Sequence, residues 1–380
     1  MERKNVLVMV SPMSTPRTEG IARFAREHDW NLMIQDRLGY HPLAWNGDGV
    51  IATLRSDSVT FSCISRLMKR GIPVVDLTMS RPDVKVPRVT SDHKAIGRLA
   101  AEHFLARNFR NTVWFSTGWG AVHAMRFQGL SSGLGQLPMK WVLTESLPKS
   151  RQNDWTSFKK WLLSAFSAAE KPIAALTYDE TDGARLLNAA LELGISVPEE
   201  LAILTIGDNR IICENQTVPL SSIDQNLELG GYEAADLLSS LMAGRKAPRT
   251  PRLIPPAGIV VRRSTEVVAV SDTTVRRAME CITKNLSRAI GAPQVAEAVG
   301  VSRSALDALF REHLARSVIE EIRRQRFAKA KLLLSATGMS VAEIASATGY
   351  CTPSHLSNTF RDKTGVSPRD WRRQGRTAEA

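Results

Sequence analysis

The sequence has few cysteines, and their positions suit neither a metal site nor a disulfide framework. Four thiols are scattered over 380 residues, at Cys63, Cys213, Cys281 and Cys351. No two of them stand at the spacing of zinc ligands, and isolated thiols are typical of a reducing compartment. No Walker phosphate loop and no H-E-x-x-H motif occurs either. We therefore expect no metal and no cofactor.

Long apolar runs are also absent. No run reaches the length that crosses a bilayer, and residues 6–10 are too few for the core of a signal peptide. These absences predict a soluble, cytoplasmic protein that has no membrane partner.

A hydrolase pattern is present, but it lacks the context that would give it meaning. Gly129-Leu130-Ser131-Ser132-Gly133 matches G-x-S-x-G, which marks a nucleophile only where a strand runs directly into the serine. Residues 122–128 have a helical pattern instead. We therefore expect that the protein is not an enzyme.

Short apolar runs alternate with amphipathic stretches over residues 1–250. The runs, which predict strands, are 5–10, 49–54, 72–77, 112–115, 141–144, 173–177 and 201–206. The stretches, which predict helices, include 17–28, 59–70, 94–107, 155–168, 182–193 and 227–242. Strands separated by helices indicate parallel sheets covered on both faces. So many strands favour two α/β lobes that face each other across a cleft.

The composition changes after this region and divides the chain into three parts. A last extended stretch at 258–261 is followed by a polar segment, and the pattern from residue 274 onward is wholly helical. We predict a ligand-sensing domain at residues 1–265, a linker at 266–273 and an all-α domain at 274–376.

The all-α domain contains one pattern twice, about fifty residues apart. Each copy has an alanine four residues before a glycine, then a leucine and a phenylalanine four apart; the copies are Ala296, Gly300, Leu306, Phe310 and Ala345, Gly349, Leu356, Phe360. Small alanines let two helices approach, and glycine adopts the positive φ of the turn between them. The alternative is an ordinary helical bundle, but two copies favour two helix-turn-helix units.

The charge distribution agrees with a polyphosphate partner. The net charge is +12, and residues 271–380 hold 18 Lys and Arg against 11 Asp and Glu. A basic third of a chain suits double-stranded DNA.

The second helix of each unit is expected to enter the major groove, with Ser302 and Thr352 as its N-caps. The outward residues near its start are the candidate DNA contacts: Arg303, Ser304, Asp307 and Ala308, and Ser354, His355, Ser357 and Asn358. Asn358 can pair with adenine, and Arg303 with guanine or a phosphate. Asp307 either accepts from cytosine or is a solvated helix residue. Basic side chains further along suit phosphates: Arg311, Arg361, Lys363, Arg372 and Arg373.

The tail resembles the AraC family of bacterial transcription regulators over residues 275–371. The residues that carry the resemblance are Ser302-Arg303, Leu306, Phe310, Arg326, Ala330, Leu333-Leu334, Ile344-Ala345, Gly349-Tyr350, Phe360-Arg361, Thr364-Gly365 and Ser367-Pro368. The resemblance implies that both units dock on one face of the DNA and recruit RNA polymerase. A connecting helix over 318–334 would span about 25 Å, which suits neighbouring major grooves.

Polar residues that follow the predicted strands are candidates for a small-molecule site, because ligands bind beyond the carboxyl ends of parallel strands. They are Ser14, Arg17, Asp92, Arg126, Tyr178, Asp179, Asp208 and Asn209. Asp, Asn and Arg suit polyol hydroxyls. The alternatives are structural: Asp92 and Asp179 as helix caps, Arg17 as a surface residue, and Arg126 with Asp208 as an ion pair. Trp119 or His123 either stacks on a sugar or belongs to the rim or core.

This region resembles the ligand-binding domain of the lactose-repressor and periplasmic sugar-binding superfamily. The residues that carry the resemblance are Gly47-Asp48-Gly49-Val50-Ile51, Val89, Asp92, Gly97, Ala100, Arg126, Gly129-Leu130, Pro198, Leu201, Ile206-Gly207-Asp208-Asn209, Leu220-Ser221-Ser222-Ile223 and Gly230. It implies that Arg126 and Asp208 hold sugar hydroxyls, assisted by Asp179 and Asn209.

A sensor of this kind ahead of an AraC-type tail is the architecture of bacterial regulators of the xylose-operon type. The resemblance implies a homodimer at the nucleoid that activates sugar-utilisation genes when xylose or a related sugar closes the lobes. Ser14 and Tyr178 depart from the pattern of those sensors. The competing hypothesis is a ligand-independent regulator whose front domain serves only dimerisation.

Overall fold

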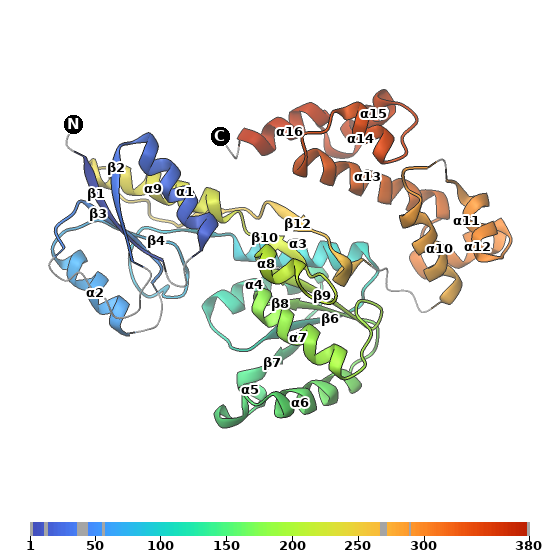
Figure 1. Cartoon of the computed structure of the whole chain (residues 1–380), viewed down its shortest axis with the longest axis horizontal. Coiled ribbons are helices and arrows are strands. Elements are labelled where there is room, and N and C mark those ends of the chain that lie inside the picture. The colour runs from blue at the N-terminus through green and yellow to red at the C-terminus, as the bar shows by residue number, and fades with distance from the viewer. Residues whose placement is uncertain are drawn as a thin grey trace. The chain divides into compact units, whose positions relative to one another are not determined.

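The computed structural model describes residues 3–10, 14–35, 45–54, 58–266, 272–288 and 290–377. The chain forms two compact units, Met1–Val267 and Val268–Ala380, and Figure 1 labels the helices and strands of both. The division falls at the start of the predicted linker 266–273, of which residues 267–271 lie outside the described residues.

The first unit begins with a four-stranded parallel sheet in the order β2-β1-β3-β4. Its strands are β1 (Lys4–Met9), β2 (Trp30–Ile34), β3 (Gly49–Ala52) and β4 (Val74–Asp76). Helices α1 (Thr15–Glu27) and α9 (Leu227–Met242) cover one face, and α2 (Ser58–Lys69) covers the other. Val8, Phe24 and Leu238 pack together in the core beneath α1 and α9. This is the N-terminal lobe.

The second lobe of this unit contains a six-stranded sheet in the order β12-β10-β9-β8-β6-β7. Its strands are β6 (Asn111–Ser116), β7 (Met139–Val142), β8 (Ile173–Thr177), β9 (Leu201–Ile206), β10 (Ser221–Asp224) and β12 (Gly258–Val260). All pairs are parallel except β10 with β12. The strands β5 (Val89–Ser91) and β11 (Arg252–Ile254) pair in a two-stranded parallel sheet; both belong to segments of the chain that pass from the N-terminal lobe to the second lobe.

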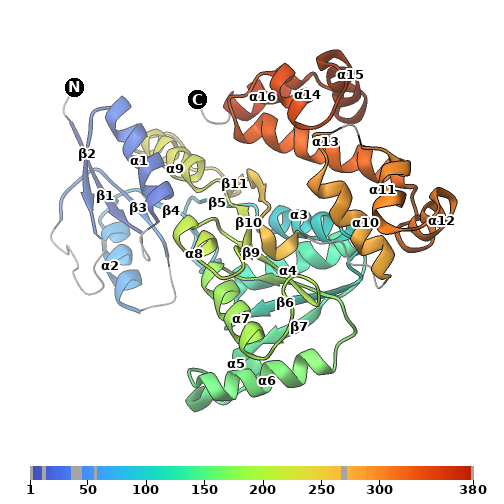
Figure 2. The same cartoon turned by 45° about the vertical axis from the view of Figure 1, so that its right-hand side comes forward.

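The helices of the second lobe lie on both faces of its sheet (Figure 2). They are α3 (His93–Ala106), α4 (Ala121–Leu134), the short α5 (Leu143–Ser146), α6 (Trp155–Ser167), α7 (Glu180–Glu192) and the short α8 (Arg210–Glu214). Phe115 on β6 packs against Phe158 on α6 in the core of one face. The predicted α/β fold in two lobes with parallel sheets is therefore confirmed.

Close backbone contacts fix two helix pairs that carry candidate site residues. A Cβ atom on Gly97 of α3 would overlap the carbonyl oxygen of Arg126 on α4, and one on Gly129 would overlap that of Lys94. A Cβ atom on Gly231 of α9 would likewise overlap the carbonyl oxygen of Arg17 on α1. These glycines let the helices touch backbone to backbone, and they place Arg126 and Arg17 accurately.

The second unit is wholly helical, as predicted. Its helices are α10 (Thr273–Lys284), α11 (Ala292–Val299), α12 (Arg303–Leu314), α13 (Val318–Ala336), α14 (Val341–Ala347), α15 (Pro353–Thr364) and α16 (Pro368–Thr377). Leu306 and Phe310 are buried in the core of the first half, and Leu356 and Phe360 in that of the second. The burial of all four follows the predicted pattern.

The sequence interpretation was wrong in part for the first unit. The run 141–144 predicted a strand, but Thr144 lies in α5, because β7 has already ended at Val142. Strands β2 and β11 were not predicted from their local sequences. Both lie at a sheet edge, where alternation between core and solvent is weak. Among the described residues, no helix is long and apolar enough to cross a membrane.

Candidate ligand site and candidate DNA interface

Three of the predicted ligand residues cap helices. Asp92 accepts a hydrogen bond from the Ala95 backbone N–H (2.8 Å), and Asp179 accepts one from that of Asp182 (2.8 Å). Asn209 accepts from the Ile211 N–H (3.1 Å). The capping role proposed for Asp92 and Asp179 is therefore confirmed. One carboxylate oxygen of each Asp is used at its helix N-terminus.

Arg126 is buried and bonds to neutral acceptors. Its Nη1 donates to the Tyr178 carbonyl oxygen (2.7 Å), and its Nη2 donates to Gln225 Oε1 (2.7 Å). Its Nε lies 3.4 Å from His93 Nδ1. Burial lowers the pKa of Arg126, although the nearby Tyr178 and Asp179 oppose the shift. The suggested ion pair with Asp208 does not form; Arg126 instead contacts the start of α3 and the residues that directly follow β8 and β10.

Arg17 from the N-terminal lobe lies near this point. Its side chain is half-buried, and the described residues give it no hydrogen-bond or ion-pair partner. Burial lowers the pKa of Arg17 to about 10; Asp76 opposes the shift and Arg126 adds to it by repulsion. The two predicted guanidinium groups are thus close enough to interact, although they come from different lobes. Ser14 begins α1 without a side-chain capping bond.

Tyr178 lies in an aromatic group. It stacks on His123 with ring centroids 3.8 Å apart, and the Arg126 guanidinium lies 4.8 Å from its ring centroid. Lys140 Nζ lies 3.9 Å from the Trp119 ring centroid. Burial lowers the pKa of His123 to about 4, with repulsion from Arg126 in the same direction. One face each of His123 and Trp119 is therefore already covered within the protein.

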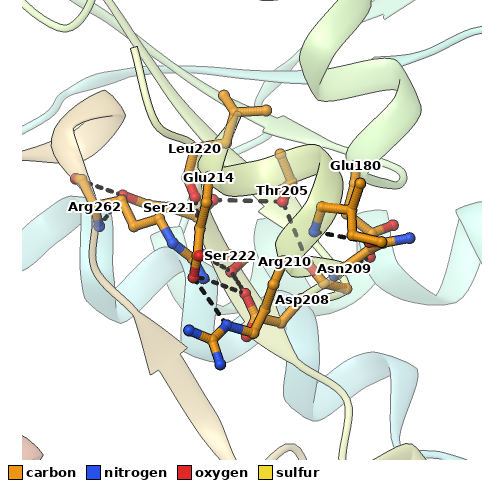
Figure 3. A network of polar contacts seen from close by, with 12 residues as sticks. Glu180, Thr205, Asp208, Asn209, Arg210, Glu214, Leu220, Ser221, Ser222 and Arg262 are labelled. Atoms are coloured by element: carbon orange, nitrogen blue, oxygen red, sulfur yellow. Dashed lines mark hydrogen bonds and ion pairs between the residues drawn. The ribbon is translucent and has the colours of Figure 1, made fainter. Parts of the chain in front are cut away.

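Asp208 belongs to a separate polar network (Figure 3). Its Oδ1 accepts from Ser222 Oγ (2.5 Å) and lies 2.8 Å from Arg262 Nη2. The described residues give its Oδ2 no partner. Two residues near the end of β10 approach the two groups separately: burial raises the pKa of Asp224, with repulsion from Asp208 in the same direction, and Gln225 bonds to Arg126.

Four further polar residues near these groups were not predicted. Asp76 is fully buried and pairs with Arg88 at 2.9 Å; burial raises its pKa, against bonds from Leu54 N–H and Arg88. His93 and Gln225 contact Arg126 as described above. Asp76 and Gln225 each end or follow a strand, so the rule that selected the other candidates would have found them. Burial lowers the pKa of His93 well below its usual value, so this side chain is neutral.

One cavity of the N-terminal lobe lies apart from these residues. This cavity of about 370 Å³ lies at the amino ends of β1 and β2 and is lined by Arg3, Ala22, Ala25, Arg26, Asp29, Trp30 and Leu32. None of the predicted ligand residues lines it. The candidate ligand site therefore rests on the grouping of polar side chains between the lobes.

The second unit contains two helix-turn-helix units, α11 with α12 and α14 with α15. Their turn glycines, Gly300 and Gly349, have φ values of +77° and +71°. Ser302 Oγ caps α12 by accepting from Ala305 N–H (3.2 Å), and Thr352 Oγ1 caps α15 by accepting from His355 N–H (3.1 Å). The predicted turns and caps are therefore confirmed.

Most of the predicted DNA contacts are exposed on α12 and α15. The exposed residues are Arg303, Ser304, Ala308, Arg311, Ser354, His355, Asn358 and Arg361. Ser357 is half-buried, and its hydroxyl donates to the Pro353 carbonyl oxygen (2.9 Å). Arg303 also lies 3.9 Å from Asp307 Oδ2, and the His355 ring packs on Tyr350.

Two residues near this face have structural bonds that the sequence did not indicate. Asp307 Oδ1 accepts from the Val318 backbone N–H (3.0 Å) at the start of α13, which is neither of the roles considered for it. Arg372, expected at a phosphate, donates to the carbonyl oxygens of Leu334 (3.2 Å) and Met339 (2.6 Å). The side chain of Arg373 lies outside the described part of the chain.

Contacts between the two helix-turn-helix units hold these units together within the helical domain. Arg326 on α13 donates to the carbonyl oxygens of Leu286 (3.3 Å) and Arg288 (2.8 Å), which precede α11. A Cβ atom on Gly349 would overlap the same Leu286 oxygen and press on Arg326. The turn of the second helix-turn-helix unit therefore packs directly on the backbone that precedes the first helix-turn-helix unit.

Comparison with known proteins agrees with this two-part organisation. Residues 101–265 match the periplasmic binding protein-like domain, and residues 295–374 match a helix-turn-helix domain. The xylose operon regulatory protein of Escherichia coli K12 is 26% identical over 93% of this chain and 92% of its own length. The arabinose operon regulatory protein of Salmonella typhimurium is 33% identical over 37% of this chain and 45% of its own.

Solved structures share the fold. The structure of the xylose-binding transcription activator xylR covers 98% of both chains, with a TM-score of 0.61 and 22% identity. The complex of the transcriptional regulator CelR with cellobiose covers 69% of this chain and 85% of its own, with a TM-score of 0.54 and 20% identity.

The chain therefore combines a periplasmic binding protein-like domain with a helix-turn-helix domain that follows it. Over nearly its whole length it resembles the xylose operon regulatory proteins. Both predicted resemblances are confirmed.

Proposed function

We propose that the protein is a sequence-specific DNA-binding regulator controlled by a small carbohydrate, xylose or a related sugar, held between the lobes of the sensor. We further propose that it acts as a homodimer, that it activates sugar-utilisation genes, and that it recruits RNA polymerase. The observation that carries the proposal is the buried Arg126, held by Tyr178 and Gln225, in a periplasmic binding protein-like domain attached to two helix-turn-helix units.

The chemistry of the site suits a polyol. Guanidinium groups donate from fixed directions, and carboxylates accept from hydroxyls. Arg126 is already oriented by Tyr178 and Gln225, so little freedom would be lost when a ligand binds. Asp208 Oδ2 and the second oxygens of Asp92 and Asp179 are the proposed acceptors. A sugar that contacts both lobes would favour their closed arrangement, and it would act only through its different affinity for the two arrangements.

The first test is a thermal-shift panel of pentoses and hexoses, including D-xylose, on the full chain. One sugar should raise the melting temperature, and Arg126→Lys should remove at least about tenfold of its affinity, since a lysine cannot reproduce the forked contacts. Arg110→Lys, at an exposed position of the same lobe, is the matched control and should bind normally. If no sugar shifts the wild-type protein, the ligand-independent hypothesis replaces this one.

The second test concerns the reading residues. Asn358 is proposed to contact adenine, and Arg361 is proposed to contact a phosphate. Asn358→Ala should relax the preference at one base position of DNA selected from a random pool, whereas Arg361→Ala should weaken binding to all sequences alike. Equal, sequence-independent losses in both variants would remove Asn358 as a reader.

A further inference from the structure

A continuous polar network leads from Asp208 to the end of the sensor domain, and Arg262 is at its centre. Arg262 has a side chain only 11% exposed, and its guanidinium reaches four groups. These are Asp208 Oδ1 (2.8 Å), Ser222 Oγ (2.8 Å), the Leu220 carbonyl oxygen (3.0 Å) and Glu214 Oε1 (3.2 Å). Figure 3 shows Asp208 from the loop after β9, Glu214 from α8, Ser222 from β10 and Arg262 from the segment after β12.

The backbone of Arg262 continues the network through Ser221. The Ser221 hydroxyl accepts from the Arg262 N–H (2.8 Å), donates to the Arg262 carbonyl oxygen (2.8 Å) and accepts from Thr265 Oγ1 (2.8 Å). One donor and two acceptor positions are all that a serine hydroxyl has, so its capacity is filled. A movement of the Arg262 backbone would therefore disturb Ser221 and, through it, Thr265.

Hydrogen bonds from His103 and Arg107 hold Thr265 against the C-terminal end of α3. Because its hydroxyl proton points to Ser221, its oxygen accepts from His103 Nε2 (2.9 Å), while His103 Nδ1 accepts from Arg107 (3.0 Å). Arg107 Nε also donates to the Thr265 carbonyl oxygen (2.9 Å). Burial and the neighbouring Arg107 hold the pKa of His103 well below its usual value, which keeps this ring neutral, as the pattern of bonds requires.

The anchored segment is unusually polar for its burial. Ser264 and Thr265 are fully buried, and Ser264 Oγ donates to the Ile203 carbonyl oxygen (2.6 Å) while it accepts from the Ser221 N–H (2.8 Å). Apolar side chains could hold this segment to the sheet without such a network. A buried polar network stabilises the protein only when every donor and acceptor in it has a partner. Such a network also makes the segment sensitive to one charged pair.

We infer that Arg262 is a positioning residue for the proposed sugar site and connects it to the chain that leads to the DNA-binding unit. Arg262 and Ser222 occupy Oδ1 of Asp208 and thereby direct Oδ2 away for a sugar hydroxyl. A sugar that immobilises Asp208 immobilises Arg262 and, through Ser221, residues 262–265, which directly precede the predicted linker. This inference rests on the proposed function for the sugar, whereas the connection itself exists without one.

The first experiment needs no sugar. Hydrogen exchange of residues 262–266 is measured by mass spectrometry on the full chain, for the wild type and for Asp208→Asn, Arg262→Lys and the double variant. Loss of a charge-assisted bond should speed this exchange by about tenfold or more. The two changes should not add, because each breaks the same pair. Rates unchanged by Asp208→Asn, or effects that multiply in the double variant, would overturn the connection.

Arg210→Gln is the matched control. Arg210 also pairs with Glu214 (3.0 Å), but its side chain is 76% exposed and makes no bond to Asp208. Its substitution should leave the exchange of residues 262–266 within about twofold, as expected for an exposed ion pair. An equal acceleration in Arg210→Gln would mean that Glu214, not Asp208, holds Arg262, and would overturn the inference.

The second experiment adds D-xylose, and then each sugar that stabilises the wild type. A stabilising sugar should slow the exchange of residues 262–266 in the wild type and lose this effect in Arg262→Lys. If no sugar stabilises the wild type, the proposed function fails while the first experiment still decides the connection. If a sugar binds but leaves this exchange unchanged, the route through Arg262 is wrong and the sugar site is not.

Discussion

The two turn glycines of the DNA-binding unit offer a matched pair of substitutions with different expected costs. Gly300 and Gly349 have nearly equal positive φ values, +77° and +71°, so an alanine at either position suffers similar backbone strain. That strain is about 1–2 kcal/mol for a non-glycine residue in the left-handed region. At Gly300, a Cβ atom would meet nothing within 4 Å. We therefore expect Gly300→Ala to lower the free energy of unfolding by about 1 kcal/mol, since a less flexible unfolded chain offsets part of the strain.

Gly349→Ala adds a steric term that Gly300→Ala lacks. Its Cβ atom would overlap the Leu286 carbonyl oxygen and crowd the Arg326 guanidinium, and both groups are held by their own hydrogen bond. Forcing an extra methyl group into a packed contact costs about 1–3 kcal/mol. The total should therefore be about 3 kcal/mol. The difference from Gly300→Ala, about 2 kcal/mol, corresponds to a roughly 30-fold change in an opening equilibrium.

Hydrogen exchange of the helical unit in the full chain measures both costs, because local opening free energies follow from the protection of its amides. Binding to the selected DNA should separate the variants as well, since relief of the overlap must move one reading unit away from the other. Gly300→Ala should bind within a few-fold of wild type at both half-sites. Equal protection and equal DNA affinity in the two alanine variants would refute the contact between Gly349 and the Leu286 backbone ahead of the first helix-turn-helix unit.

Two further predictions concern single carboxylates. Burial, with repulsion from Asp179, raises the pKa of Asp182 from 3.8 to about 6. The protonated Asp182 therefore contributes its full stabilisation below about pH 4, and this stabilisation is lost as the pH rises through 6. In calorimetry, Asp182→Asn should be neutral at pH 4 but should stabilise the sensor by up to about 3 kcal/mol at pH 7.5. Asp307→Ala should cost about 1–2 kcal/mol in the helical unit by leaving the buried Val318 N–H unpaired, with no change in base preference. A changed preference at one position without loss of stability would instead restore the cytosine contact.

The sequence predicted the DNA-binding unit in detail because its signals are local. A helix-turn-helix unit needs a cap, a positive-φ turn and two apolar residues four apart, all within about twenty residues of chain. Ser302 is the cap, Gly300 is the positive-φ turn residue and Phe310 is one of the two apolar residues. The bond from Val318 N–H to Asp307 could not be predicted in the same way, because it depends on how α13 leaves α12.

The contacts among the proposed ligand residues could be predicted only in part, since these residues come from distant parts of the chain. The rule that polar residues follow strands selected Arg126 and Asp208 correctly as buried or half-buried polar groups. It could not show that Arg126 bonds to Gln225, which is 99 residues away, or that Asp208 pairs with Arg262. Arg262 carries no local signal at all: it follows a short edge strand and would be assigned to the surface by its residue type.

The division of labour among the acidic residues explains which substitutions can reveal function. Asp92 and Asp179 each spend one oxygen on a helix N-terminus, so their removal would cost about 1 kcal/mol of stability whether or not a sugar binds. Loss of a sugar response in those variants would therefore be ambiguous. Asp208 caps no helix and is held by side chains instead. A change at Asp208 acts on the proposed site and on the Arg262 network alone, so its effects on sugar binding and on residues 262–266 should rise and fall together.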